Sequence, residues 1–252
     1  PEADQLAVPL SMSLQKSVEA NVLTAKVTVT NSGAGHSVPT GEPLRSVLLL
    51  VTAACDGKEL VAIGGDAVPD YGGAIATKRA DEDWSTWETA TVGDIVRVIK
   101  RGAPVDYVGY GPFGDGTFSI EERGIFKETV VGQSVVDNAS EGSVTLTPPL
   151  PEGDIAYLTR GETAFAGAPG AGFARVLVDN DGNRMVPHFK AVDVVSDNRL
   201  MSQGSWSSSH LFETSCASPK VTVRIIQRAY PLSLAKERGW PMRDKVWLTE
   251  TK

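Results

Sequence analysis

The sequence LTAKVTVT, at residues 23–30, decides the fold class. Its apolar residues, at the odd positions from Leu23 to Val29, alternate with threonine and lysine. Alternation with a period of two is typical of a β-strand that has one buried face and one wet face. The stretch NSGAG at residues 31–35 follows directly and predicts a turn at the end of this strand.

The next apolar segment, SVLLLVTA at residues 46–53, does not alternate. A short continuous run of valine and leucine predicts a central strand that is buried on both faces. Asp56 and Gly57 then supply a hairpin turn, and residues 59–63 are the expected return strand.

Short strand patterns separated by Gly, Pro, Asn and Asp recur along the rest of the chain, with almost no helical periodicity. Further strands are expected at residues 95–99, 116–120, 126–131, 143–146, 174–178, 189–195 and 220–229, and one short helix at residues 231–238, closed by Gly239. This pattern predicts an all-β fold, an immunoglobulin-like β-sandwich. Residues 1–63 and 165–252 would form its core, and residues 64–164 would be a long insertion of loops and short strands or a small second β subdomain.

Composition excludes several classes of protein. The 252 residues carry a formal net charge of −7, which would repel a polyanion, so nucleic acid is not an expected partner. No apolar run approaches the roughly 18 to 20 residues of a transmembrane helix. The chain starts at Pro1 rather than Met, which favours a mature exported chain over a trimmed or truncated one, with a periplasmic or extracellular location.

The two cysteines, Cys55 and Cys216, lie far apart, and no CxxC is present, which argues against a zinc ribbon or a redox pair. They are either a disulfide or two buried thiols, and an exported protein favours the disulfide. The bridge would require the strand end at Cys55 to lie beside the segment before Val221.

Three histidines carry most of the metal-binding and acid–base options. His36 stands in a polar, glycine-flanked loop, where it could ligate a metal or a haem iron, or could hold the loop through a neighbouring carbonyl. His188 follows Met185, and this pair could serve a soft metal such as copper, although methionine more often fills a core. His210 follows the serine-rich run 205–209 and is expected on an edge strand or in a loop. A copper site built from all three histidines is an alternative that no HxH spacing supports.

The sequence contains no motif for nucleophilic catalysis, phosphate binding or covalent haem attachment. There is no GxSxG elbow and no phosphate-binding glycine loop. The acidic residues Asp81, Glu82 and Asp83 suit a solvated loop or, as an alternative, a calcium site. No CxxCH occurs, so the chain cannot attach its own c-type haem in the usual way. We therefore expect no catalytic residue.

Aromatic residues gather in two short segments. Trp84 and Trp87 share one, and Tyr107, Tyr110 and Phe113 share a glycine-rich one. Aromatic side chains on loops suggest an interface with a protein or a carbohydrate. The alternative is that they cap the core of the sandwich.

Two stretches resemble a known family. The first, VTNSGAGHSVPTGEPLR at residues 29–45, is similar to a motif of the β-rich, non-haem C-terminal domain of secreted multihaem c-type cytochromes. The second runs from Gly167 to Leu177, continues through Pro187-His188 and residues 195–199, and resembles the later part of that domain, as does Val221 to Pro231. The likeness covers roughly residues 15–63 and 165–240, and the chain departs from the family in having no haem-binding CxxCH.

This resemblance implies a module that docks on a multihaem c-type cytochrome in an electron-transfer complex and binds no haem covalently itself. It makes His36, and after it His188, candidate axial ligands to a haem c of the partner chain. Two other functions are left open by the residues. One is a copper-binding periplasmic metalloprotein using His36, His188, His210 and Met185. The other is a surface adhesion or carbohydrate-binding module using the two aromatic segments.

Overall fold

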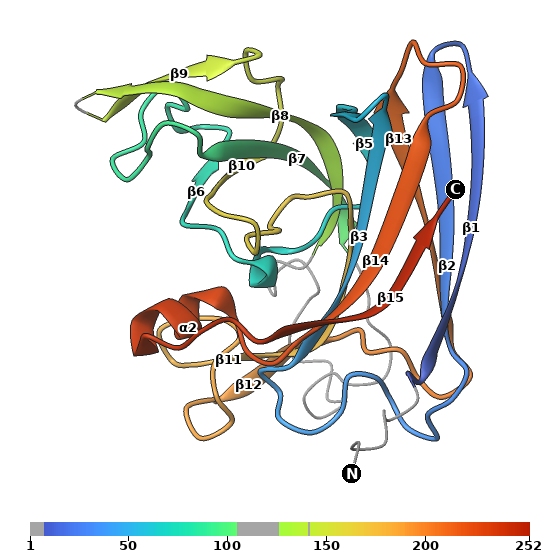
Figure 1. The fold of residues 1–252 in the computed structure, drawn as a ribbon. Helices are drawn as coiled ribbons and strands as arrows, with labels where there is room; N and C mark the ends of the chain where they lie inside the picture. The colour runs from blue at the N-terminus through green and yellow to red at the C-terminus, as the bar shows by residue number, and fades with distance from the viewer. Residues whose placement is uncertain (1–7, 105–125, 141) are drawn as a thin grey trace.

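The fold is an all-β sandwich, as predicted, with a third sheet packed beside it (Figure 1). The computed structural model describes residues 8–104, 126–140 and 142–252. Every strand pairing in it is antiparallel among the described residues. No helix in this part of the chain is long and apolar enough to cross a membrane.

The first sheet of the sandwich has four strands. Their order is β1 (Leu10–Glu19), β2 (Val22–Asn31), β13 (Ser205–Glu213) and β5 (Ala62–Gly65). The alternation read from residues 23–30 holds in β2, whose odd-numbered residues from Leu23 to Val29 are buried.

The second sheet of the sandwich has β3 at its centre. Its order is β12 (Asp193–Asp197), β11 (Gly170–Val178), β3 (Ser46–Cys55), β14 (Lys220–Arg228) and β15 (Asp244–Thr251), and β4 (Lys58–Glu59) pairs with the end of β3. Helix α2 (Leu232–Arg238) connects β14 to β15 and ends at Gly239 in a left-handed conformation, as predicted.

Strand β3 is buried on both faces because two different cores cover it. Val47, Leu49 and Val51 point into the sandwich with residues of the first sheet. Leu48 and Leu50 point the other way and pack against Val68 and Ala168, outside the sandwich. The continuous apolar run of β3 is therefore explained by its position between two layers.

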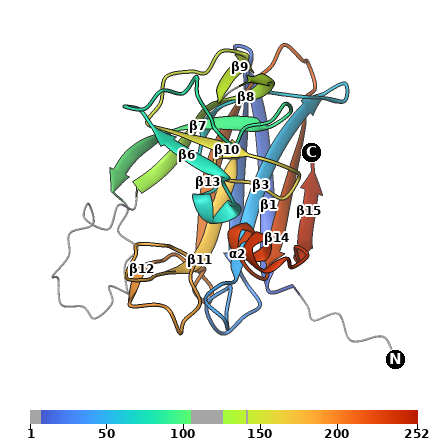
Figure 2. The ribbon, with the colours of Figure 1, turned by 90° about the vertical axis from the view of Figure 1, so that its left-hand side faces the viewer.

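The third sheet is built from strands of residues 64–164. Its order is β6 (Ala76–Arg79), β10 (Ile155–Thr159), β7 (Ile95–Pro104), β8 (Phe126–Ser140) and β9 (Ser143–Thr147). It lies in front of the upper part of the sandwich, with the short 3-10 helix η1 (Asp70–Gly72) below it (Figure 2). Residues of this sheet, among them Ile99 and Val130, also join the sandwich core, so the boundaries at 63 and 165 stay a prediction. The strand expected at 116–120 lies outside the described residues.

The expected disulfide is present: the Cα atoms of Cys55 and Cys216 are 6.0 Å apart and their sulfurs are bonded. It joins the end of β3 to the segment that precedes β14, as the sequence required.

Some strand predictions were wrong. The expected return strand divides into β4 and β5, which belong to different sheets. Residues 189–192 are not a strand, and β12 begins only at Asp193. His210 is not in a loop or on an edge strand, because β13 is an inner strand between β2 and β5. Strand β13 was not predicted because serine is not typical of strands. In the structure, the hydroxyls of Ser205 and Ser207 pair with threonines of β2, at 2.8 and 2.9 Å, in place of the usual contacts between β-branched side chains.

Candidate functional site

The two motif stretches, far apart in sequence, meet at one end of the sandwich. The side-chain amide of Asn31 donates hydrogen bonds to the carbonyls of His36, at 2.8 Å, and Leu200, at 3.1 Å. Val38 and Leu200 pair through two backbone hydrogen bonds, and the Gly204 carbonyl accepts one from the Asn31 N–H. Residues 32–45, 187–192 and 200–204 are called the histidine end below.

Other polar residues of the second motif hold this end in place. Asp197 accepts hydrogen bonds from Arg175 and Arg199 at 2.7–2.8 Å, and these guanidinium contacts offset its burial and keep its pKa below the ordinary value. The Asn198 side chain bonds the backbone of Gly172 and Ala174 on β11. These motif residues are therefore structural.

His36 differs from them because its side chain is exposed and because the hydrogen bond of its ring, among the described residues, is local. Its Nδ1 lies 3.1 Å from the carbonyl oxygen of Ser37. Since a carbonyl can only accept, Nδ1 carries the proton in this hydrogen bond. The neutral ring then has its lone pair on Nε2, the usual arrangement of an iron-ligating or zinc-ligating histidine.

His188 repeats this arrangement on the neighbouring segment. Its Nδ1 lies 3.2 Å from Glu42 in the His36 loop, and the imidazole side chain is 66% exposed. The carboxylate fixes Nδ1 as the donor and leaves the lone pair of the neutral ring on Nε2. Met185 does not accompany His188 to the surface, because it is buried and packs against Ala174 and Val176.

The structure does not bring the three histidines together. His210 is fully buried in β13, with Nε2 2.9 Å from the Ser208 hydroxyl. Burial lowers its pKa from 6.5 to about 4, and the weaker effect of the Asp66 backbone acts the other way. In the described chain, the one group of three or more potential metal ligands is Cys55, Asp56 and Cys216, whose sulfurs are bonded to each other.

Exposed apolar side chains occur on the same segments as the two exposed histidines. Among the described residues, three of the four most exposed large hydrophobic side chains lie at the histidine end: Phe189 at 72%, Met201 at 62% and Val192 at 55%. The Phe189 ring stands edge-on to His188, with ring centres 5.7 Å apart. Apolar groups gathered around polar ligands are typical of an interface.

The other predicted residues do not form a site in this structure. Trp87 is 2% exposed and belongs to the core of the third sheet, so it offers no surface to a partner. Trp84 is half-buried, and its indole donates to the Arg79 carbonyl at 2.7 Å. Tyr107, Tyr110 and Phe113 lie outside the described residues.

The proposed calcium ligands serve their own loop. The Glu82 carboxylate accepts from the Arg79 N–H at 2.7 Å, and the Asp83 carboxylate accepts from the Ser85 N–H and hydroxyl. Asp81 is exposed beside them. These carboxylates do not converge on one point.

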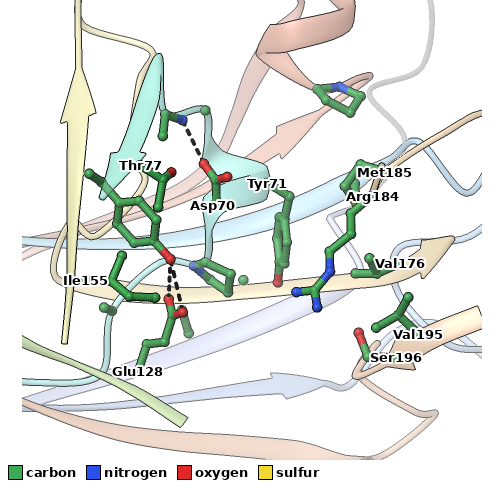
Figure 3. Close-up of a pocket in the computed structure, with 18 of the residues that line it drawn as sticks. Asp70, Tyr71, Thr77, Glu128, Ile155, Val176, Arg184, Met185, Val195 and Ser196 are labelled. Carbon is green, nitrogen blue, oxygen red and sulfur yellow. Dashed lines mark hydrogen bonds between the residues drawn. The ribbon is translucent and has the colours of Figure 1, made fainter. Parts of the chain in front are cut away.

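Sequence reasoning missed a cavity of about 570 Å³ between the sandwich and the third sheet (Figure 3). Its lining comes from η1, from strands of the sandwich and of the third sheet, from the segment between β11 and β12 and from the start of α2. Gly172 of β11 helps to shape it, because a Cβ there would lie 2.2 Å from the Tyr71 hydroxyl. The bare backbone lets the Tyr71 ring lie against the strand as part of the wall.

Two carboxyl groups line this cavity, the half-buried Glu128 and the more exposed Asp70. Glu128 accepts from the Tyr157 hydroxyl at 3.0 and 3.2 Å, and burial raises its pKa from 4.5 to about 7. Asp70 accepts from the Ala74 N–H at 2.8 Å, and burial raises its pKa as well. Burial, followed by the charge of Glu128, raises the pKa of Tyr157 well above its ordinary value. Arg184 acts on both carboxyls from the opposite wall and lowers their pKa values, but burial outweighs it.

Comparisons with known proteins give a distant likeness in fold. No protein-family model and no curated protein matches the sequence. Among solved structures, the chain is similar to a penta-heme cytochrome c552 from Thermochromatium tepidum, with 14% identity and a TM-score of 0.46. The similarity covers 97% of this chain and 39% of that one. We draw no functional argument from a likeness at this level.

Proposed function

We propose that this chain is a non-catalytic, exported β-sandwich subunit that docks on a multihaem c-type cytochrome through the histidine end. The observation that carries the proposal is the state of His36: it is exposed, and the hydrogen bond of its Nδ1 to a backbone carbonyl leaves the lone pair of the neutral ring on Nε2. The disulfide supports export, since such bonds persist in oxidising compartments.

In this complex, His36 Nε2 would occupy an axial position on one haem iron of the partner. The exposed Phe189, Met201 and Val192 would pack around that haem and exclude water. Axial ligation and burial both tune haem reduction potential, so docking would set the potential of one haem in an electron-transfer chain. His188, held by Glu42, would be the second ligand or a hydrogen-bonding contact at the rim.

The described geometry gives the two other functions less support. A copper site is not assembled, because His210 and Met185 are buried away from the surface that presents His36 and His188. Of the tryptophans proposed for an adhesion surface, Trp87 is in the core.

The proposal can be tested with the purified chain immobilised and exposed to a periplasmic extract of the source cell. We expect retention of a c-type cytochrome with several haems per polypeptide. The His36→Ala variant should lose most of this retention, and the complex should lose the electron paramagnetic resonance signal of one imidazole-ligated low-spin haem. Lys58→Ala, in the hairpin at the opposite end of the sandwich, is the matched control.

Either of two results would overturn the proposal. One is that the extract yields no haem protein bound to the native chain. The other is that His36→Ala and Lys58→Ala retain the same cytochrome equally well. If His36→Ala still retains the cytochrome but Phe189→Ser does not, the result would support docking at this end and contradict axial ligation by His36.

A further inference from the structure

Two exposed cations stand on the turns of the histidine end, and the first is Lys190. Its backbone N–H donates to the Pro187 carbonyl at 2.9 Å, which closes a turn and places Lys190 two residues after His188. Its charge acts weakly on Asp179, a carboxylate that is held mainly by hydrogen bonds from Asn183. The ammonium group of Lys190 is therefore displayed to solvent beside the exposed imidazole.

The second cation, Arg45, is held in place by its own loop. Its backbone N–H donates to the Glu42 carbonyl at 3.0 Å, and its guanidinium Nη1 lies 3.3 Å from the Thr40 carbonyl oxygen. Gly41 permits this contact, because it has φ +84° and a Cβ on it would lie 2.9 Å from that Nη1. A guanidinium has five N–H donors, so most of those of the exposed Arg45 stay available to a partner.

A hydrogen bond joins the two turns. His188 Nδ1 lies 3.2 Å from the Glu42 carboxylate. Arg45 is three residues from Glu42, and Lys190 is two residues from His188, so the two cations flank this contact. Because a four-residue turn spans less than about 7 Å between its end Cα atoms, both cations can reach one planar group that is seated over the contact.

The charge of the histidine end differs from that of the rest of the molecule. Its segments contain two cations and one acid, for a formal charge of +1, although the whole chain carries −7. At the opposite end of the sandwich, residues 19–22, 55–61 and 213–219 contain four acids and one lysine, for a formal charge of −3. An anionic group is therefore attracted to the histidine end and repelled from the other end.

We propose that Lys190 and Arg45 bind the propionate groups of the partner haem that His36 ligates. The inference rests on the docking function proposed above and names the chemical group that the histidine end recognises. A haem carries both propionates on one edge of its ring, so two cations beside the rim contact His188 would fix how the ring is turned. A guanidinium binds a carboxylate through two parallel hydrogen bonds, and an ammonium group binds it as a point charge.

The test is a spectroscopic titration of the native chain with iron mesoporphyrin and with its dimethyl ester, both in a neutral detergent. The propionates are the sole carboxyl groups of this compound, and ligation by an imidazole produces a low-spin absorption spectrum. We expect the free acid to bind about tenfold more tightly than the ester. Lys190→Gln and Arg45→Gln should each reduce this ratio about threefold, and the double variant should bring it close to one.

The control variants separate this inference from the docking function. Lys58→Gln, at the opposite end of the sandwich, should leave the ratio unchanged, and His36→Ala should lose the low-spin spectrum with both compounds. Equal affinity of the native chain for acid and ester would overturn the inference and leave the docking function standing. A ratio that survives in the double variant would do the same. Absence of a low-spin spectrum with either compound would overturn both the inference and axial ligation by His36.

The captured cytochrome gives a second measurement. The double variant of Lys190 and Arg45 should retain about tenfold less of it than the native chain does. If retention falls while the ratio of acid to ester affinity is unchanged, the cations contact acidic side chains of the partner, and the assignment to propionates is overturned. Thermal unfolding of each variant shows that it is folded, and both substituted side chains are exposed.

Discussion

At the scale of single residues, His210 and Glu128 make the stability of the protein depend on pH in opposite directions. His210 is neutral in the folded protein, with a pKa lowered by burial from 6.5 to about 4. Its contribution to stability is present above pH 6.5 and is lost as the pH falls toward 4, because the unfolded chain takes up the proton first. Burial raises the pKa of Glu128 from 4.5 to about 7, so its contribution is present below 4.5 and lost as the pH rises through 7.

The variant His210→Gln should therefore change the pH profile of the free energy of unfolding. Between pH 6.5 and 4, the native chain should lose about 3 kcal/mol through His210, and the variant should not. Relative to the native chain, His210→Gln should thus gain stability as the pH falls through this range. Glu128→Gln should show the opposite trend between pH 7 and 4.5. Urea unfolding at several pH values measures both, and parallel profiles for the two variants would contradict the assignment.

At the scale of elements, the pairing of β5 with β13 depends on a close approach of two backbones. Gly65 has φ +100°, and a Cβ on it would lie 2.2 Å from the Ser209 carbonyl oxygen and 2.6 Å from the His210 Cα. Both obstacles are backbone atoms of an inner strand, which cannot rotate away. The pairing also shifts register between Leu211 and Phe212. A glycine at this point lets the short edge strand close the first sheet.

Gly65→Ala should consequently destabilise the protein more than a positive φ alone explains. Gly57 is the matched control, since it has φ +81° and a Cβ there would meet nothing within 4 Å. Gly57→Ala should cost about 1–2 kcal/mol for the backbone conformation, and Gly65→Ala about 3 kcal/mol or more. Urea unfolding of the two variants gives the comparison. Equal losses would show that the close contact relaxes freely.

The elements also show how far the sequence could predict the structure. Period-two apolar patterns located β2 and β14, and the continuous run at 46–53 located β3 with both faces buried. β13 was not predicted, because its outward face is formed by serines. The threonines that pair with these serines are known only once the strands are paired.

Of the two sites, one could be predicted from the sequence and the other could not. The histidine loop could be predicted, since glycines and His36 are adjacent in sequence. The cavity could not be predicted, because its polar lining residues come from separate segments whose spacing in the sequence does not indicate that they are close in space. Four of these residues are Asp70, Glu128, Tyr157 and Arg184. The raised pKa values of Asp70 and Glu128 arise from desolvation, which only the assembled layers produce.

At the scale of the whole molecule, three layers share one central strand. β3 contributes one face to the sandwich core and the other to the apolar cluster beneath the third sheet. The histidine end and the cavity are therefore both supported by the second sheet, through the loop that precedes β3 and through β11, which pairs with it.

The disulfide closes this assembly, because Cys55 and Cys216 are separated by 161 residues that contain the whole third sheet and much of both sites. Chain entropy for a ring of this length gives about 5 kcal/mol of stabilisation, or about 10–20 °C in the melting temperature of a chain of this size. The melting temperature of the native chain should fall by that amount in reductant. The variant carrying both Cys55→Ser and Cys216→Ser should start from the lower value and show no response. A native chain that melts at the same temperature with and without reductant, despite confirmed reduction of the bond, would contradict this, and would mean that residual structure already restricts the unfolded ensemble as much as the bridge does.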